Sequence, residues 1–148
     1  ALKGNYTRYK AIKIAQYRRL AAIKLEGWTR AMAAQILRQK YFRWHDAGDV
    51  QDLDHLNKIY KVCELTPDVK HWMPTREAWI KKHLDRKPAN LVIRFSPPMI
   101  GQRNDSWPNS SMVVETGATC PAPDQNNSCG SCRQCWDPEL KVVSYGKH

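Results

Sequence analysis

No stretch of the 148-residue sequence approaches the roughly 18 consecutive apolar residues that a membrane-spanning helix needs, so no membrane partner is expected. Phenylalanine is scarce, with 2 residues, but 6 Trp and 6 Tyr are spread along a chain that is 42% hydrophobic. This composition is too apolar and too aromatic for a disordered tail. The chain is also too short for a complete eight-stranded α/β barrel, which takes roughly 200 to 250 residues. We therefore expect a single domain over residues 1–148.

Acidic residues are almost absent from the N-terminal third. Glu26 is the one acid among residues 1–43, against eleven Lys and Arg, whereas residues 44–148 hold thirteen of each sign. Such a local surplus favours nucleic acid as a partner, because neutralised phosphates release counterions. The candidate nucleic-acid-binding residues are Lys3, Arg8, Lys10, Lys13, Arg18, Arg19, Arg30 and Arg38. The alternative is a solvated helical surface, since the basic residues form no clean stripe.

Strand and helix patterns alternate beyond residue 40, which predicts an α/β fold with a mostly parallel sheet of about five strands. Helices are expected over residues 6–25 and, capped by Thr29, after Gly27, which gives a basic helical N-terminal third. Further helices are expected at residues 52–65 and, capped by Thr75, at residues 76–84. The expected strands cover residues 41–45, 69–73, 91–95, 111–115 and 141–145. A reduced barrel is one form that such a sheet takes.

Polar side chains stand at the ends of the expected strands. His45, Asp46 and Asp49 follow the first strand in the motif HDAGD, and Glu115 ends the fourth. The carboxyl ends of parallel strands share one rim, so these four are the candidate catalytic residues, as acids or bases. The plainer alternative is that the HDAGD residues build a turn and cap the next helix. Because the cysteine-bearing loop leaves just after Glu115, we expect the rim and the cysteines to share a pocket.

Four of the five cysteines lie in one sixteen-residue window. Cys120, Cys129, Cys132 and Cys135 have the spacing C-x8-C-x2-C-x2-C, and Cys120 precedes a proline. A C-x2-C-x2-C run with a remote Cys-Pro is typical of a [4Fe-4S] cluster, which is the expected cofactor. Zinc is the alternative, although it more often uses two separated C-x2-4-C knuckles, and disulfides fit poorly between cysteines so close in sequence. Cys63 lies on the apolar face of an expected helix and is given no chemical role.

Several segments together resemble a known family: FRWHDAGDVQDLDHL, HWMPT, VIRFSPP, SSMVVETGATCP and CGSCRQCWDPELKVVSYGKH. The sequence is similar over nearly its whole length to the phage family named after mycobacteriophage gene product 88. The resemblance implies a phage protein working in the host bacterial cytoplasm, and by analogy a partial barrel akin to radical S-adenosylmethionine enzymes. The C-x3-C-x2-C signature of that chemistry is absent. The start ALKGNY resembles a segment that follows a cysteine-containing region in such proteins, so a fragment lacking its native N-terminal region is expected.

These observations give one main hypothesis and two alternatives. The main hypothesis is a phage iron-sulfur protein whose basic N-terminal helices bind nucleic acid. The first alternative is a metalloenzyme with a partial barrel, in which His45, Asp46, Asp49 and Glu115 act near the cluster. The second is a zinc-stabilised structural module or one that binds a host protein.

Overall fold

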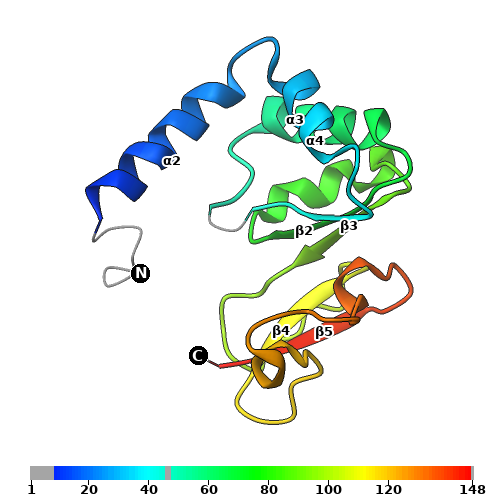
Figure 1. Ribbon diagram of the computed structural model, residues 1–148. Helices are drawn as coiled ribbons and strands as arrows, with labels where there is room; N and C mark the ends of the chain where they lie inside the picture. Colours follow the sequence, from blue (N-terminus) through cyan, green and yellow to red (C-terminus); the bar gives the residue numbers. More distant parts are fainter. Residues whose placement is uncertain (1–8, 46–47, 148) are drawn as a thin grey trace.

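A curled, all-parallel sheet organises the chain. The computed structural model describes residues 9–45 and 48–147, and its five strands follow one another in chain order as a half-barrel (Figure 1). The strands are β1 Tyr41–Arg43, β2 Lys70–Thr75, β3 Leu91–Phe95, β4 Ser110–Val114 and β5 Val142–Gly146. The predicted α/β fold with a parallel sheet of about five strands is therefore confirmed.

Helices connect only the first half of this sheet. The helix α4 (Leu53–Leu65) links β1 to β2, and the 3-10 helix η1 (Ala78–Arg86) links β2 to β3. Before them come α2 (Lys10–Ile23) and α3 (Trp28–Ile36). The second half is joined by irregular chain, which holds the short 3-10 helices η2 (Ala122–Gln125) and η3 (Gln134–Trp136). The pairing between β3 and β4 is short, with Phe95 opposite Ser110.

The two faces of the sheet are buried in different ways. On one face, side chains of β1 to β3 pack with those of α3, α4 and η1, among them Trp44, Met73, Ile93 and Ile59. On the other face Trp72 and Val143 form a second apolar cluster with Cys135 of the cysteine-bearing segment. Alternation along the strands assigns each side chain to one face. The cysteine segment therefore covers the face that no crossover helix covers.

The residues that cap the helices differ from the predicted ones. The predicted cap residues Thr29 and Thr75 do not cap: α3 begins after Gly27, and η1 begins after Glu77. The Thr75 hydroxyl instead accepts a hydrogen bond from the Glu77 N–H at 3.0 Å. Asp52 caps α4 by accepting from the His55 N–H at 2.8 Å. No helix in residues 9–45 and 48–147 is long and apolar enough to cross a bilayer.

A fully buried histidine sits between α4 and the sheet. His71 Nδ1 accepts a hydrogen bond from the Trp44 indole N–H at 3.2 Å, so the ring carries its proton on Nε2. Its Nε2 lies 2.9 Å from the Thr66 hydroxyl, which itself donates to the Val62 carbonyl. A second proton on the ring would face the indole N–H, and burial lowers the pKa of His71 to about 4. Burial likewise lowers the pKa of His55 to about 4.

We predict that the free energy of unfolding falls as the pH drops from about 6.5 toward 4. The folded-state pKa values of His55 and His71 lie below the value in the unfolded chain. As the pH falls, the unfolded chain therefore binds protons first, and the folded state loses stability relative to it. Urea unfolding between pH 7 and pH 4 measures the loss, which should be on the order of a few kcal/mol. His71→Phe should flatten the profile, whereas His83→Gln, a change on η1, should keep the wild-type shape. A wild-type profile that is flat over this range would contradict the assignment.

Candidate metal centre and basic helix

The structure brings the four clustered cysteines around one cavity. Cys120, Cys129, Cys132 and Cys135 line it together with Pro121, Ala122, Gln134, Trp136 and Val143. All four are free thiols. Cys135 is buried, Cys120 and Cys132 are half-buried and Cys129 is exposed, so the cavity reaches from the packed face of the sheet to the surface. Residues that are up to fifteen positions apart in the sequence therefore share one site.

Hydrogen bonds hold the start and the middle of this loop. The Cys120 N–H donates to the Ser144 carbonyl at 3.0 Å, and the Thr119 N–H donates to the Ser144 hydroxyl at 2.8 Å, so the segment begins along the outer edge of β5. Between the other cysteines, the Cys132 N–H donates to the Cys129 carbonyl at 2.8 Å. The turn needs Gly130, whose φ is +50° and whose added Cβ would lie 2.9 Å from the Gln125 side-chain oxygen.

One guanidinium organises the third part of the loop. Arg94 of β3 is fully buried and donates to five backbone carbonyls. Its bonds to the loop are 3.0 Å to Cys135, 2.9 Å to Gln134, 2.7 Å to Asp137 and 2.8 Å to Leu140, and the fifth, to Ser110, is 3.4 Å. Arg94 was not among the predicted site residues. The available signal was an arginine inside a strand of otherwise apolar residues, and nothing local indicated that its partners lie 40 positions later.

Further polar groups surround the cavity. The Tyr145 hydroxyl lies 3.1 Å from Cys135 Sγ. Burial raises the pKa of Cys135, while the hydrogen bond with Tyr145 and the charge of Arg94 act against that rise. Trp72 Nε1, Ser111 Oγ and Gln134 Oε1 are buried without a hydrogen-bond partner, and Trp72 belongs to the same apolar cluster as Cys135. Buried polar groups without partners are uncommon, so this face of the sheet is rich in unused hydrogen-bonding capacity.

The thiols line the cavity without converging on one point. Within the described ranges, no three His, Cys, Asp or Glu side chains form a group that could hold a single metal ion. A zinc ion with bonds of about 2.3 Å would require its thiolates to meet within roughly 4 Å of one another. A cubane cluster instead binds each thiolate to a different iron atom, which spreads the ligands around it. The cavity volume is about 10 Å³, which is the room of about one water molecule, so the choice between the two groups rests on the spacing of the cysteines in the sequence.

The candidate acid-base residues do not line this cavity. Asp46 lies outside the described residues, and neither His45, Asp49 nor Glu115 contributes to the lining. Glu115 is exposed, and its carboxylate lies 3.9 Å from the Lys147 ammonium. The expectation of one shared pocket is therefore not met for the rim residues that the structure describes.

Asp49 ties two strand ends together instead of capping a helix. Its carboxylate accepts from the Thr75 hydroxyl and the Arg76 N–H, both at 2.7 Å, and from the Val50 N–H at 2.7 Å. The turn-and-cap alternative was thus wrong about the cap, which is Asp52. His45 adopts a left-handed φ of +56°, and its ring lies 5.7 Å from that of His55. Burial lowers the pKa of His45, and its Nε2 has no partner.

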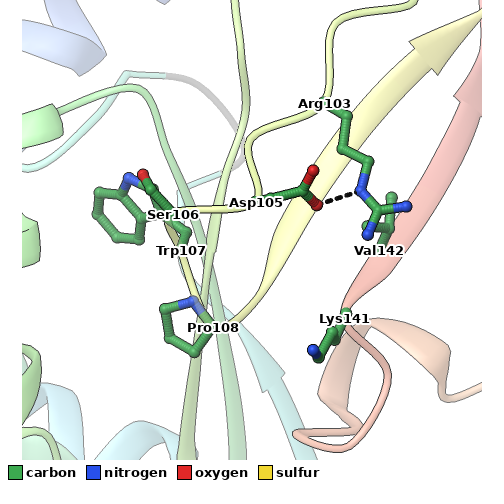
Figure 2. Close-up of a pocket in the computed structure, with 7 residues that line it drawn as sticks. All are labelled: Arg103, Asp105, Ser106, Trp107, Pro108, Lys141 and Val142. Atoms are coloured by element: carbon green, nitrogen blue, oxygen red, sulfur yellow. Dashed lines mark hydrogen bonds and ion pairs between the residues drawn. The ribbon is translucent and has the colours of Figure 1, made fainter.

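A larger hollow lies elsewhere. Its volume is about 390 Å³. Figure 2 shows the residues that line it, which lie on the loop that precedes β4 and at the start of β5. Arg103 pairs there with Asp105, and Lys141 and Trp107 complete its walls. It contains no cysteine and no candidate catalytic residue, so it supports none of the sequence-based site predictions.

The basic N-terminal residues lie on exposed helix. In Figure 1 α2 extends away from the sheet, and none of its residues is buried. Two contacts fasten its end to the domain: Lys58 donates to the Ile23 carbonyl, and Lys24 pairs with Asp52. The described candidates are all exposed: Lys10, Lys13, Arg18 and Arg19 on α2, Arg30 on α3, and Arg38 just after it. Lys3 and Arg8 lie outside the described residues.

Comparison with known proteins identifies the family of the chain. The family model described as Gene product 88 matches residues 1–138. The chain belongs to the gene product 88 family. The phage family inferred from the sequence motifs is thereby confirmed. No curated protein and no solved structure matched the chain.

The hydrogen bonds of Asp49 predict a stability effect larger than that of a helix cap. Asp49→Ala leaves three donors without their acceptor and should cost about 1 to 3 kcal/mol. Asp52→Ala removes the α4 cap and should cost about 1 kcal/mol. Urea unfolding at neutral pH measures both, with the exposed Asp68→Ala as the control, expected within about 0.5 kcal/mol of wild type. An Asp49→Ala protein as stable as the Asp68→Ala control would show that Asp49 is free to serve catalysis.

Proposed function

We propose that this gene product 88 family protein is an iron-sulfur protein whose cavity holds a [4Fe-4S] cluster and whose basic helix binds nucleic acid. The cluster ligands are Cys120, Cys129, Cys132 and Cys135. The observation that carries the proposal is the shared cavity, which all four cysteines of the C-x8-C-x2-C-x2-C pattern line. The cluster would supply electron transfer or a rigid link among distant loop residues, and the chain would hold it through these four thiolates. Its proposed place of action is the host bacterial cytoplasm.

Two features support the cluster over a single zinc ion. The cysteines form one continuous run with a remote Cys-Pro, which suits a cubane. Hydrogen-bond donors without partners stand in the same packed face, and inorganic sulfides accept such bonds. A zinc-stabilised module remains the second candidate, because zinc also prefers thiolates.

The nucleic-acid part of the proposal rests on α2. The helix α2 has fourteen residues and no buried side chain, so packing against the domain gives it little stability. We infer that a binding partner stabilises it. The helix carries Lys10, Lys13, Arg18 and Arg19 and no acidic residue. This charge suits the phosphate backbone, and Tyr17, which is 62% exposed, adds an aromatic surface for stacking. A host protein with an acidic surface would be the alternative partner.

Replacing a cluster ligand should abolish metal binding. Cys132→Ser, prepared without oxygen, should lose the bound iron and inorganic sulfide together with the visible absorbance, and it should melt at a lower temperature than the loaded wild type. Cys63→Ser is the matched control. Burial raises the pKa of the Cys63 thiol to about 12, and it lies in the apolar core away from the cavity.

The wild-type composition separates the candidates. Iron and sulfide in equal amounts, with a broad visible band, support the cluster, whereas one colourless zinc per chain would establish the zinc module. A Cys132→Ser protein with wild-type metal content would refute the site itself.

Affinity for nucleic acid should depend steeply on salt. The plot of log affinity against log salt concentration should have a negative slope. Changing Arg18 and Arg19 together to Ala should make that slope shallower by about 1.4 to 1.8, the equivalent of two phosphate contacts. The matched control is Lys81→Ala with Lys82→Ala, two adjacent exposed lysines on η1. Fluorescence titrations with single-stranded and double-stranded oligonucleotides at several salt concentrations measure the slope. Equal slopes for both double variants would place the contact elsewhere, and no binding at low salt would remove the nucleic-acid function.

A further inference from the structure

Two groups that the proposed ligand set does not use contact Cys135, one of the residues that line the cavity: Arg94 donates to its carbonyl, and the Tyr145 hydroxyl lies 3.1 Å from its Sγ. We infer that Arg94 and Tyr145 are positioning residues that set the reduction potential of the sulfur centre, Arg94 by its charge and Tyr145 by a hydrogen bond to the Cys135 thiolate. This inference rests on the proposed cluster and names the part of the chain that regulates it. It does not require either residue to bind iron.

Arg94 is buried in a way that leaves its charge uncompensated. Its side chain is fully buried, yet each of its five hydrogen bonds goes to a neutral carbonyl. Within residues 9–45 and 48–147 no carboxylate forms an ion pair with the guanidinium, and the Asp137 carboxylate accepts from the Glu139 N–H. A buried charge without a counter-charge is costly unless an anion lies nearby.

The thiolate centre supplies that anion. A cubane core of charge +2 bound by four thiolates carries a net charge of −2, and Arg94 contacts the carbonyl of one ligand residue, Cys135. The positive charge therefore stabilises the negative centre, and it stabilises the reduced state more because that state carries one further electron. Removing the charge should make the cluster harder to reduce.

Tyr145 acts on the same ligand from the other side. Its hydroxyl lies 3.1 Å from Cys135 Sγ, and once the thiol is a metal-bound thiolate the hydroxyl must be the donor, because the thiolate has no proton to give. Hydrogen bonds to ligand sulfurs raise cluster potentials. Ser111 Oγ and Trp72 Nε1 have no partner in the same face, and they offer further donors of the same kind.

A purely structural role for Arg94 predicts something different. If the guanidinium only crosslinks the loop, its loss should reduce cluster content and stability without changing the potential of the clusters that remain. If it sets the potential, a substitution that keeps the charge should behave unlike one that removes it. The reduction potential therefore distinguishes the two roles.

The experiment measures the midpoint potential of the cluster by an electron paramagnetic resonance titration of the anaerobically prepared full chain, with iron and sulfide content determined first. Tyr145→Phe keeps the ring and should retain the cluster with a potential more negative than wild type. Arg94→Gln should shift the potential further in the same direction, and Arg94→Lys, which keeps the charge, should shift it less. Arg86→Gln is the control, since Arg86 is exposed at the end of η1, which packs on the opposite face of the sheet from Cys135.

The outcomes are separable. A wild-type protein without iron and sulfide refutes the proposed function and this inference with it. A loaded wild type whose Tyr145→Phe and Arg94→Gln variants keep the wild-type potential overturns this inference alone. If Arg94→Gln does not fold, the Tyr145→Phe and Arg94→Lys proteins decide, and a Tyr145→Phe potential equal to wild type overturns the hydrogen-bonding role.

Discussion

The cysteine-bearing segment depends on one buried guanidinium. Between β4 and β5 the chain forms only two short 3-10 helices, so regular hydrogen bonding satisfies few of its carbonyls. Arg94 provides donors for the carbonyls of Gln134, Cys135, Asp137 and Leu140, and thereby turns an irregular loop into a fixed layer. The rigid fork of an arginine suits this task, because five donors leave one planar group in set directions. A lysine in the same strand would leave several of these carbonyls unsatisfied.

This layer also solves a problem of the half-barrel. A parallel sheet needs both faces covered, yet the crossover helices cover one face of its first three strands. The other face carries Trp72 and Val143, which the cysteine segment buries with Cys135 and Trp136. The Trp136 indole N–H reaches the Phe42 carbonyl at 3.1 Å, so the segment spans the sheet from β5 back to β1. The proposed cofactor site and the cover of this apolar cluster are thus the same piece of chain, so metal binding there would be coupled to the stability of the domain.

Much of the fold follows from the sequence pattern, and the departures have local causes. The strand at residues 91–95 was predicted with its observed bounds, and the other strands differ from their predicted bounds by one or two residues at one or both ends. The cap of α4 was missed because HDAGD offers several carboxylates, and only the tertiary contact with Thr75 and Arg76 shows that Asp49 is otherwise engaged. That the four cysteines lie around one cavity could be predicted from their spacing, but their contacts with Arg94 and Tyr145 could not. Their contacts depend on the order of the strands and on the face of the sheet on which each side chain lies, and a local sequence pattern predicts neither.

The two halves of the proposed function are separated by the way the chain is built. The basic charge lies on α2, which Figure 1 places away from the cysteine segment and which touches the domain near α4 through Lys24 and Lys58. At physiological ionic strength exposed charges are screened beyond about 8 Å, so the lysines and arginines of α2 would have little influence on the proposed sulfur centre. Arg94 would act on such a centre, because it is buried, where screening is weak, and it donates to the carbonyl of Cys135. In the proposed protein, any coupling between nucleic-acid binding and the cluster would therefore have to pass through packed residues, starting where Lys24 and Lys58 join the end of α2 to the domain.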